Sequence, residues 1–162
     1  MPNISPSENS TFIRQAYSSE AQLISQLALR SKGHWGYDQE FLRQCTVELS
    51  YTPEQLSSPR FYFAVAENNT QIVGFYGLNL CENSTTELEA LFVEPASIGL
   101  GIGKMLLSDA LHTLKQRGAE KLLIQGDPNA TEFYQRNGGK LIGQLASHSI
   151  PGRNLPLFEI NV

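Results

Sequence analysis

A glycine-rich turn followed by a basic residue is the part of the sequence best suited to chemistry. Residues 91–107 read LFVEPASIGLGIGKMLL, an apolar run followed by Gly99, Gly101, Gly103 and Lys104. Glycines let the backbone turn tightly and come close to a ligand. The first N–H groups of a helix have no partner within the helix and can bind phosphate. The turn therefore predicts a phosphate site; the alternative is a strand-to-helix turn without a ligand.

The two commonest nucleotide-binding fingerprints do not fit this turn. A P-loop requires Ser or Thr after the lysine and glycine six residues before it, where this chain has Met105 and Ile98. A dinucleotide-binding fingerprint requires its third glycine at the position of Lys104. The turn must therefore belong to another class of phosphate site, if it is one.

The turn resembles the pyrophosphate-binding motif of the GNAT superfamily, the acyl-CoA-dependent N-acyltransferases. That motif reads Gln or Arg, two residues, Gly, one residue, then Gly or Ala; Gly101 and Gly103 match its end, and Ile98 departs from its start. The resemblance implies that the turn holds acetyl-CoA through its backbone amides. The positions it assigns to this co-substrate are Leu91, Phe92, Val93, Gly99, Leu100, Gly101, Ile102, Gly103, Lys104, Asn129 and Tyr134.

A second match lies in residues 130–139, ATEFYQRNGG, which look like the family's A-x-x-x-Y-x-x-x-G helix. The family often has Asn three residues before the alanine. This chain has Asp127 there and Asn129 nearby, so either could contact the pantetheine arm. The resemblance makes Tyr134 the acid that protonates the leaving thiolate, a role open to a phenol that is neutral at pH 7. The alternative is an aromatic residue that only packs.

Two glutamates precede the apolar run. Transfer of an acetyl group to an amine requires removal of the amine's proton and a donor for the oxyanion. Side chains two apart on a strand share a face, so the odd-numbered residues of a strand over 87–93 should point in one direction. The resemblance makes Glu87 or Glu89 the base and the backbone of residues 91–93 the oxyanion donor. The alternative is that both glutamates only face solvent.

The three histidines, His34, His112 and His148, have no metal-ligand spacing, so no metal is expected. Residues 34–37 and 149–157 are similar to segments of bacterial-type members of the same family, near the acceptor. The candidate substrate contacts are His34, Trp35, Tyr37, His148 and Arg153. Small cationic amines, amino acids, peptides and amino sugars all remain open as acceptors.

The elements that would position these residues follow from periodicity and capping signals. Strands are expected over residues 11–17, 61–67, 71–80, 87–93, 121–125, 140–146 and 155–162. Helices are expected from Ser19 to Gly33, with a Ser19–Gln22 capping box, then over 38–49, briefly after Thr52, over 102–118 and over 127–137. The predicted fold is α+β, one GNAT-like domain over residues 11–162. Its mixed, mostly antiparallel sheet would have six to seven strands and about four flanking helices, after a disordered tail over residues 1–10.

The composition limits the kinds of partner that the chain is expected to bind. The chain has 162 residues, 41% of them hydrophobic and 17% charged, with a formal net charge of −4. Without a run of Lys or Arg, this composition argues against nucleic-acid binding, and it would not repel a cationic substrate. Cys45 and Cys81 have no framework spacing and are expected to be reduced thiols. Neither a secretion signal nor a membrane span is expected, so the predicted location is cytoplasmic.

The predicted function is that of an N-acetyltransferase. It would move the acetyl group of acetyl-CoA to a primary amine of a small molecule or peptide, by direct attack in a ternary complex. Two alternatives remain: a transferase of the same fold that uses another acyl-CoA, and a non-catalytic acyl-CoA-binding module. A homodimer is compatible with each.

Overall fold

The computed structural model describes residues 10–80 and 85–162. Most of the predicted tail over residues 1–10, and also Cys81, lie outside the described residues. The elements follow in the order β1 (Phe12–Gln15), η1 (Ser18–Glu20), α1 (Ala21–Gly33), α2 (Gln39–Cys45), α3 (Pro53–Ser57), β2 (Phe61–Asn68), β3 (Gln71–Asn79), β4 (Thr85–Val93), η2 (Pro95–Ser97), α4 (Ile102–Gln116), β5 (Lys121–Gln125), η3 (Pro128–Ala130), α5 (Thr131–Arg136), β6 (Lys140–Ala146) and β7 (Asn154–Asn161). The η elements are single turns of 3₁₀ helix.

One sheet of seven strands organises these elements, in the order β1-β2-β3-β4-β5-β7-β6. Every neighbouring pair is antiparallel except β4 and β5. The predicted α+β class with a mostly antiparallel sheet is confirmed, and the described residues hold five α-helices rather than about four. No described helix has the length and apolar character needed to cross a bilayer.

The helix starts follow the local signals. The Asp38 carboxylate accepts a hydrogen bond from the Phe41 N–H at 2.8 Å and caps α2, while the Thr52 hydroxyl caps α3. Helix α2 ends at Cys45, shorter than predicted, and turns replace its expected last residues. The predicted Ser19–Gln22 capping box is wrong. The Glu20 side chain instead accepts from the Tyr17 N–H at 2.7 Å.

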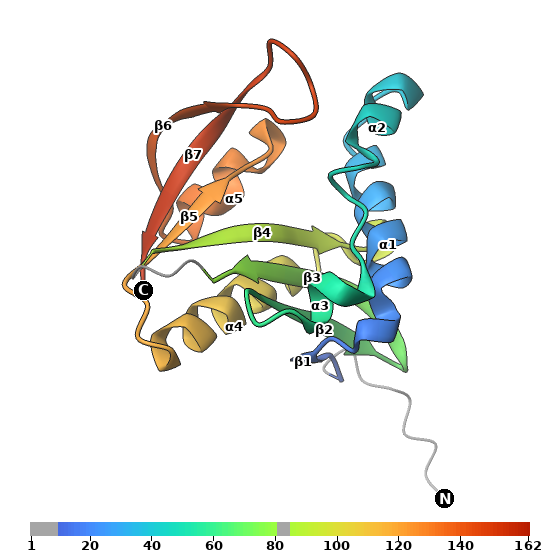
Figure 1. Cartoon of the computed structure of the whole chain (residues 1–162), viewed down its shortest axis with the longest axis vertical. Helices are drawn as coiled ribbons and strands as arrows, with labels where there is room; N and C mark the ends of the chain where they lie inside the picture. The colour runs from blue at the N-terminus through green and yellow to red at the C-terminus, as the bar shows by residue number, and fades with distance from the viewer. Residues whose placement is uncertain (1–9, 81–84) are drawn as a thin grey trace, which may run out of the picture.

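Two apolar clusters cover the two faces of the sheet. One packs α4 on the sheet through residues such as Leu106, Leu114 and Tyr76. The other packs α1 and α3 on the opposite face, around Ile24, Phe63 and Leu56 among others. Helices therefore cover the central strands from both sides and fix β4 between two packed layers (Figure 1).

Strands β4 and β5 separate soon after they pair. Their parallel register joins only three pairs, Thr85 with Lys121, Thr86 with Leu122 and Glu87 with Leu123. From Leu88 onward β4 pairs on one side only, with β3, while β5 continues beside β7. Figure 1 shows the consequence: β5, β7, β6 and α5 stand apart from α1 and α2, with β4 passing between the two groups.

A β-bulge falls on β4 at Glu89. Gly77 pairs with Ala90 and Leu78 pairs with Leu88, which leaves Glu89 as the extra residue. The expectation that the odd-numbered side chains of this strand share one face is therefore wrong. Beyond the bulge, Leu91 and Val93 pack into the α4 cluster, whereas Ala90 belongs to the α1 cluster. A bulge inserts one residue and reverses the alternation that follows it.

Candidate functional site

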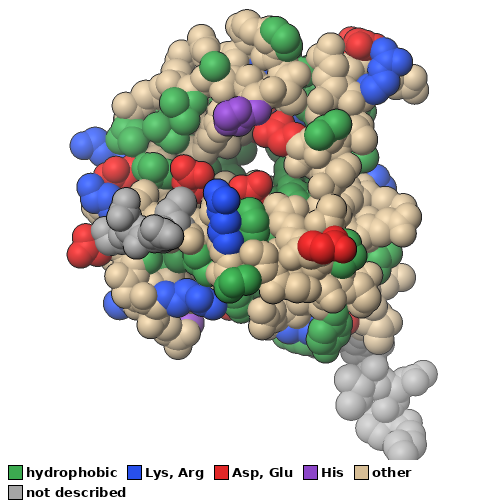
Figure 2. Space-filling model, viewed as in Figure 1, with side chains coloured by type: hydrophobic (Ala, Val, Ile, Leu, Met, Phe, Trp, Pro, Cys, Tyr) green, Lys and Arg blue, Asp and Glu red, His purple; other side chains and the backbone are tan. Residues whose placement is uncertain are grey.

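A cavity of about 1140 Å³ occupies the space between the separated strands; we call it the central cavity. Its walls come from the end of α1, the α2–α3 connection, β4, the turn before α4, β5, α5 and the β6–β7 connection. Figure 2 shows an opening through the middle of the molecule, with acidic side chains and a histidine at its rim. Elements far apart in the sequence therefore meet around one accessible space.

The glycine-rich turn forms one end of the central cavity. Gly99 and Gly101 have φ angles of +88° and +81°, in the region where a side chain is strained, and Gly101 is the N-cap of α4. No side chain caps this helix, and the N–H groups of Ile102, Gly103 and Lys104 have no hydrogen-bond partner among the described residues. All five of these residues line the cavity, and so does Ile98. A cradle of free N–H groups at a helix N-terminus, with a lysine beside it, is suited to a phosphate group.

The unpaired side of β4 forms the floor of the cavity. Leu91, Phe92 and Val93 line it. Because β5 has already turned away at Glu87, the backbone groups of these residues on that side have no strand partner. An extended chain lying against this edge could hydrogen-bond them in the manner of an added strand. The bulge at Glu89 lies at the start of this free edge, next to the carboxylate of Glu87.

Tyr134 reaches the cavity from α5. It is 6% exposed, its ring lies 5.5 Å from that of Phe158, and it lines the cavity. A Cβ at Gly126 would come within 3.1 Å of the Tyr134 ring, so glycine there makes room for the phenol. Burial, with a further contribution from the charge of Asp127, raises the pKa of Tyr134. The phenol therefore keeps its proton at neutral pH and is suited to donate it.

Glu87 and Glu89 both line the central cavity. The Glu89 side chain stays accessible to water, but the cavity walls surround it and restrict its hydration. That desolvation, followed by the charges of Glu87 and Glu48, raises the pKa of Glu89, while Arg60 and His148 act in the opposite direction. A carboxylate with a raised pKa is a stronger base, so Glu89 is suited to accept a proton.

Asp127 ties the two sides of the cavity together. Lys32 of α1 donates to its carboxylate at 2.5 Å, and the Tyr37 hydroxyl lies 2.9 Å away. The Asn129 N–H donates at 2.9 Å, and Arg153 lies 3.7 Å away while donating to the Tyr37 hydroxyl at 2.7 Å. Burial on its own would raise the pKa of Asp127, but the hydrogen bonds from Lys32 and Asn129 lower it overall. We call this group the Asp127 network.

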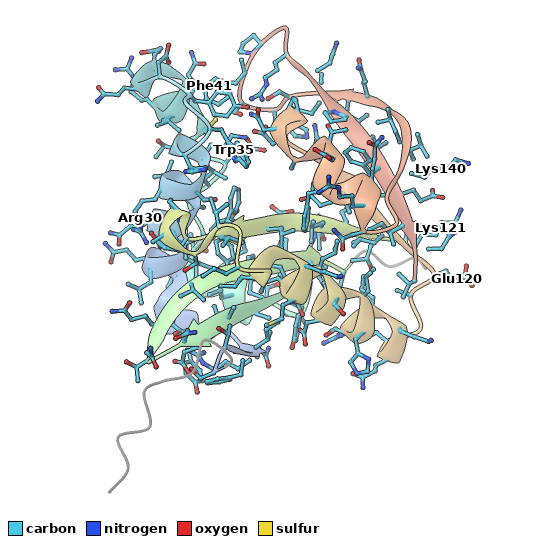
Figure 3. All side chains as sticks on the ribbon, turned by 180° about the vertical axis from the view of Figure 1, so that it is seen from behind. Arg30, Trp35, Phe41, Glu120, Lys121 and Lys140 are labelled. Carbon is cyan, nitrogen blue, oxygen red and sulfur yellow. The ribbon has the colours of Figure 1, made fainter. Side chains whose placement is uncertain are left out.

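The structure gathers most of the predicted site residues around the cavity. Trp35, Asn129, His148 and Arg153 line it with the residues described above. Figure 3 shows Trp35 at the end of α1 and Phe41 on α2, on the same side of the molecule.

Three predicted residues lie elsewhere. Leu100 is 72% exposed and does not line the cavity, and neither do His34 or Tyr37. His34 packs edge-to-face on Trp35, with ring centroids 5.4 Å apart, and Tyr37 belongs to the Asp127 network. Tyr37 therefore positions other residues rather than facing the cavity.

The lining residues that were not predicted include three polar ones, Lys32, Glu48 and Tyr51. None of them belongs to a motif, and Glu48 and Tyr51 lie in the turns between α2 and α3. Only long-range packing brings them to β4. Within residues 10–80 and 85–162, His, Cys, Asp and Glu side chains form no group of three that could hold a metal ion.

Comparison with known proteins identifies the family. Residues 24–139 match the acetyltransferase (GNAT) family, and this match spans more than half of the chain. The chain belongs to the GNAT family. The matched residues include the glycine-rich turn, β4 and α5, so the GNAT motifs coincide with the walls of the central cavity.

Individual relatives within the GNAT family share modest identity with the chain. The 5-NmdU N-acetyltransferase of Pseudomonas phage PaMx11 is 28% identical over 91% of this chain and 96% of its own. An uncharacterized ycf52-like N-acetyltransferase of Prochlorococcus marinus is 39% identical over 30% of this chain, and the match spans 27% of that relative's length. The PaiA N-acetyltransferase of Thermoplasma acidophilum, solved with coenzyme A, superposes with a TM-score of 0.77, at 22% identity over 94% of this chain and 99% of that one. The last likeness establishes the fold.

Proposed function

We propose that this chain is an N-acetyltransferase that moves the acetyl group of acetyl-CoA to a primary amine. One observation carries the proposal: the free N–H groups that begin α4 open onto the same cavity as Tyr134 and Glu89. A phosphate cradle, a proton donor and a carboxylate base around one space are the three parts that the reaction requires. The coenzyme A held by the Thermoplasma relative supports the choice of co-substrate.

The cofactor-binding residues follow from the cavity walls. The pyrophosphate of acetyl-CoA would bind the N–H groups of Ile102, Gly103 and Lys104, with the Lys104 ammonium beside it. The pantetheine arm would lie along the free edge of β4, at residues 91–93, and Asn129 on the opposite wall is a further polar partner. This path leads the thioester toward Tyr134 and the bulge.

The proposed chemistry is direct attack in a ternary complex. The amine nitrogen loses a proton to Glu89, directly or through one water, and its lone pair attacks the thioester carbonyl carbon. A backbone N–H of residues 91–93 stabilises the oxyanion. As the C–N bond forms, the carbonyl becomes the oxyanion, and its collapse breaks the C–S bond. The thiolate of CoA takes the proton of Tyr134, and the phenolate regains a proton from the new amide nitrogen, which still carries the second proton of the original ammonium. Glu89 then releases its proton to solvent. Glu87 lines the same cavity and its charge acts on Glu89, so it supplies a second negative charge near the amine.

Thiol release from acetyl-CoA in the presence of a panel of primary amines tests the proposal. The panel should include monoamines, diamines, amino acids, a peptide amine and 5-NmdU, for which the phage relative is named. Parallel reactions with propionyl-CoA and butyryl-CoA test whether a longer acyl group is preferred. Binding of CoA by calorimetry without thiol release from any amine would show a non-catalytic acyl-CoA-binding module instead.

Tyr134→Phe is the most direct test of the acid. The variant removes only the hydroxyl, so CoA should still bind, while kcat should fall by about 10²-fold or more because the thiolate leaves without a proton. Tyr17→Phe is a matched control, since Tyr17 is 62% exposed and lies outside the cavity. An unchanged kcat in Tyr134→Phe would make Tyr134 a packing residue.

A further inference from the structure

Three carboxylates face one end of the central cavity without a cationic partner. Glu48 comes from the α2–α3 connection, and Glu87 and Glu89 come from β4; all three line the cavity. We call them the acidic end. None of the ion pairs or hydrogen bonds found among the described residues involves any of these carboxylates. Some acidic groups elsewhere in the chain do form ion pairs, such as Glu20 with Arg14 at 2.7 Å and Asp127 with Lys32 at 2.5 Å.

The cations nearest to the acidic end do not neutralise it. The charges of Arg60 and His148 reach Glu89. The Arg60 guanidinium, however, donates to Asn79 Oδ1 at 3.2 Å and does not line the cavity. His148 lines the cavity without pairing with any of the three carboxylates. The cavity therefore keeps an excess of negative charge where an acceptor would sit.

Tyr51 adds an unpartnered polar group to the same cavity. Its side chain is 6% exposed and lines the same end of the cavity. Its backbone bonds the Ser25 hydroxyl, but its own hydroxyl makes no hydrogen bond among the described residues. Tyr51, Glu48 and Glu89 all line the cavity, and burial, then the charges of Glu89 and Glu48, raises the pKa of the Tyr51 phenol. No buried side-chain polar atom among the described residues lacks a hydrogen-bond partner, so the unpartnered Tyr51 hydroxyl opens onto the cavity, where a ligand group can reach it.

A monoamine acceptor would leave most of these carboxylates without a cationic partner. The attacking nitrogen must be neutral and needs one base, which Glu89 supplies in the proposed reaction. Glu48 and the Tyr51 hydroxyl would then face a part of the acceptor that does not react. An ammonium group fits there, because it can donate to a carboxylate and to a phenol oxygen at once. Val47 and Leu49 line the adjacent wall and suit an alkyl chain between the two nitrogens.

Resting on the proposed acetyl transfer, we propose that the acceptor is an aliphatic diamine or longer oligoamine. One nitrogen attacks the thioester, while a second nitrogen stays protonated and binds Glu48 and Tyr51. The same charge pattern disfavours acceptors that carry a carboxylate or phosphate next to the reacting amine. The bonds made and broken are those of the proposed transfer, since the second ammonium neither gains nor loses a proton.

The test compares 1,4-diaminobutane with butylamine, which has the same carbon chain but only one nitrogen. In the unmodified protein, kcat/KM for the diamine should exceed that for the monoamine by about tenfold or more, the effect expected of one charge-assisted contact. Glu48→Gln should remove most of this preference, chiefly by raising KM for the diamine. Added salt should weaken the preference too, because it screens the attraction.

Glu54→Gln is the matched control, since Glu54 is an exposed glutamate of α3 that does not line the cavity. It makes the same change of charge and should keep the preference for the diamine. Tyr51→Phe gives a second variant, which should also raise KM for the diamine. Calorimetric binding of CoA shows whether each variant remains folded.

The outcomes separate this inference from the proposed function. Acetyl transfer with equal kcat/KM for the two amines, or a preference that survives in Glu48→Gln, overturns the diamine inference and leaves the acetyltransferase standing. Thiol release from no amine overturns the proposed function. In that case, calorimetry with 1,4-diaminobutane and the CoA complex tests whether the acidic end binds a diamine. Binding that Glu48→Gln abolishes supports the diamine site, and absence of binding overturns it.

Discussion

At the scale of single residues, Glu89 combines an unusual backbone position with an unusual environment. It is the extra residue of the β4 bulge, and the cavity walls and two neighbouring carboxylates surround it. In the folded protein its pKa is raised, so the native state binds a proton more tightly than the unfolded chain does. The stability that this proton contributes is present below the ordinary pKa of Glu and is lost as the pH rises through the raised value.

Glu89→Gln should therefore affect activity and stability in opposite directions. At neutral pH it should lower kcat/KM by about 10²-fold, with recovery at alkaline pH where more of the amine is already neutral. At the same pH its Tm should be equal to or slightly above that of the unmodified protein, because an ionised carboxylate has been replaced by a neutral amide. This gain in Tm should vanish in acid, below the ordinary pKa of Glu.

Glu87→Gln is the matched comparison on the same strand. It removes the same charge before the bulge and should change the pH–rate profile much less. The assignment of the base to Glu89 would be wrong if the two variants gave the same profile, or if Glu87→Gln were the slower enzyme.

At the scale of elements, the turn before α4 needs glycine for its backbone conformation rather than for lack of space. Gly99 and Gly101 adopt positive φ angles, and a Cβ at either position would meet nothing within 4 Å. Backbone conformation, rather than space within the protein, therefore requires glycine there. The open space beside these glycines is the mouth of the central cavity, where the free N–H groups of α4 point.

Gly101→Asp tests this element. The substitution places a carboxylate against the proposed pyrophosphate position, so CoA affinity measured by calorimetry should fall by about 10²-fold or more through repulsion and crowding. Gly118→Asp is the control, because Gly118 has a similar φ of +78°, also has open space, and follows the far end of α4. It bears the same backbone strain and should bind CoA normally. Equal CoA binding by both variants would remove the turn from the co-substrate site.

At the scale of the whole molecule, one apolar cluster joins the two groups of elements, because it packs α4 and β3 with β5, α5 and β7. Beyond the three residue pairs of β4 and β5, the Asp127 network links α1 to η3 and to the β6–β7 connection. Tyr37 and Phe41 stack with ring centroids 4.0 Å apart, and Arg153 lies over both rings. The network thus connects opposite walls of the cavity, and we expect it to hold them together.

Asp127→Ala should destabilise the protein by about 2 kcal/mol, or ~4–8 °C in Tm, because it leaves the half-buried Lys32 ammonium unpaired. The lowered pKa of Asp127 sets the pH dependence. The stability that ionised Asp127 contributes is fully present above the ordinary pKa of Asp and is lost as the pH falls through the lower pKa of the native state. The difference in Tm between Asp127→Ala and the unmodified protein should therefore shrink in acid.

Glu132→Ala is the control for this network. Glu132 pairs with Arg136 across one helical turn, but both side chains are 75% exposed, and such pairs contribute little. Its Tm should stay close to that of the unmodified protein. An Asp127→Ala variant as stable as Glu132→Ala would show that the network does not hold the walls of the cavity.

The sequence alone determined the features that depend on neighbouring residues. The positive-φ glycines, the Asp38 and Thr52 caps, the order of strands and helices, and the place of Tyr134 on a short helix all follow from local conformational preference. The resemblance to the GNAT superfamily rested on two such local motifs, which is why the fold and family could be predicted.

Only the tertiary structure decided how these elements face one another. The bulge at Glu89 depends on the pairing of β4 with β3, and it reversed the predicted direction of Leu91 and Val93. Glu48 and Tyr51 reach the cavity because α1 and the α2–α3 connection pack on one side of β4. A periodic pattern specifies which side chains of a strand are apolar, but an inserted residue shifts the register without changing that pattern. Contacts between distant segments arise from packing of the whole chain, so the acidic end and the Asp127 network could be seen only once the chain was folded.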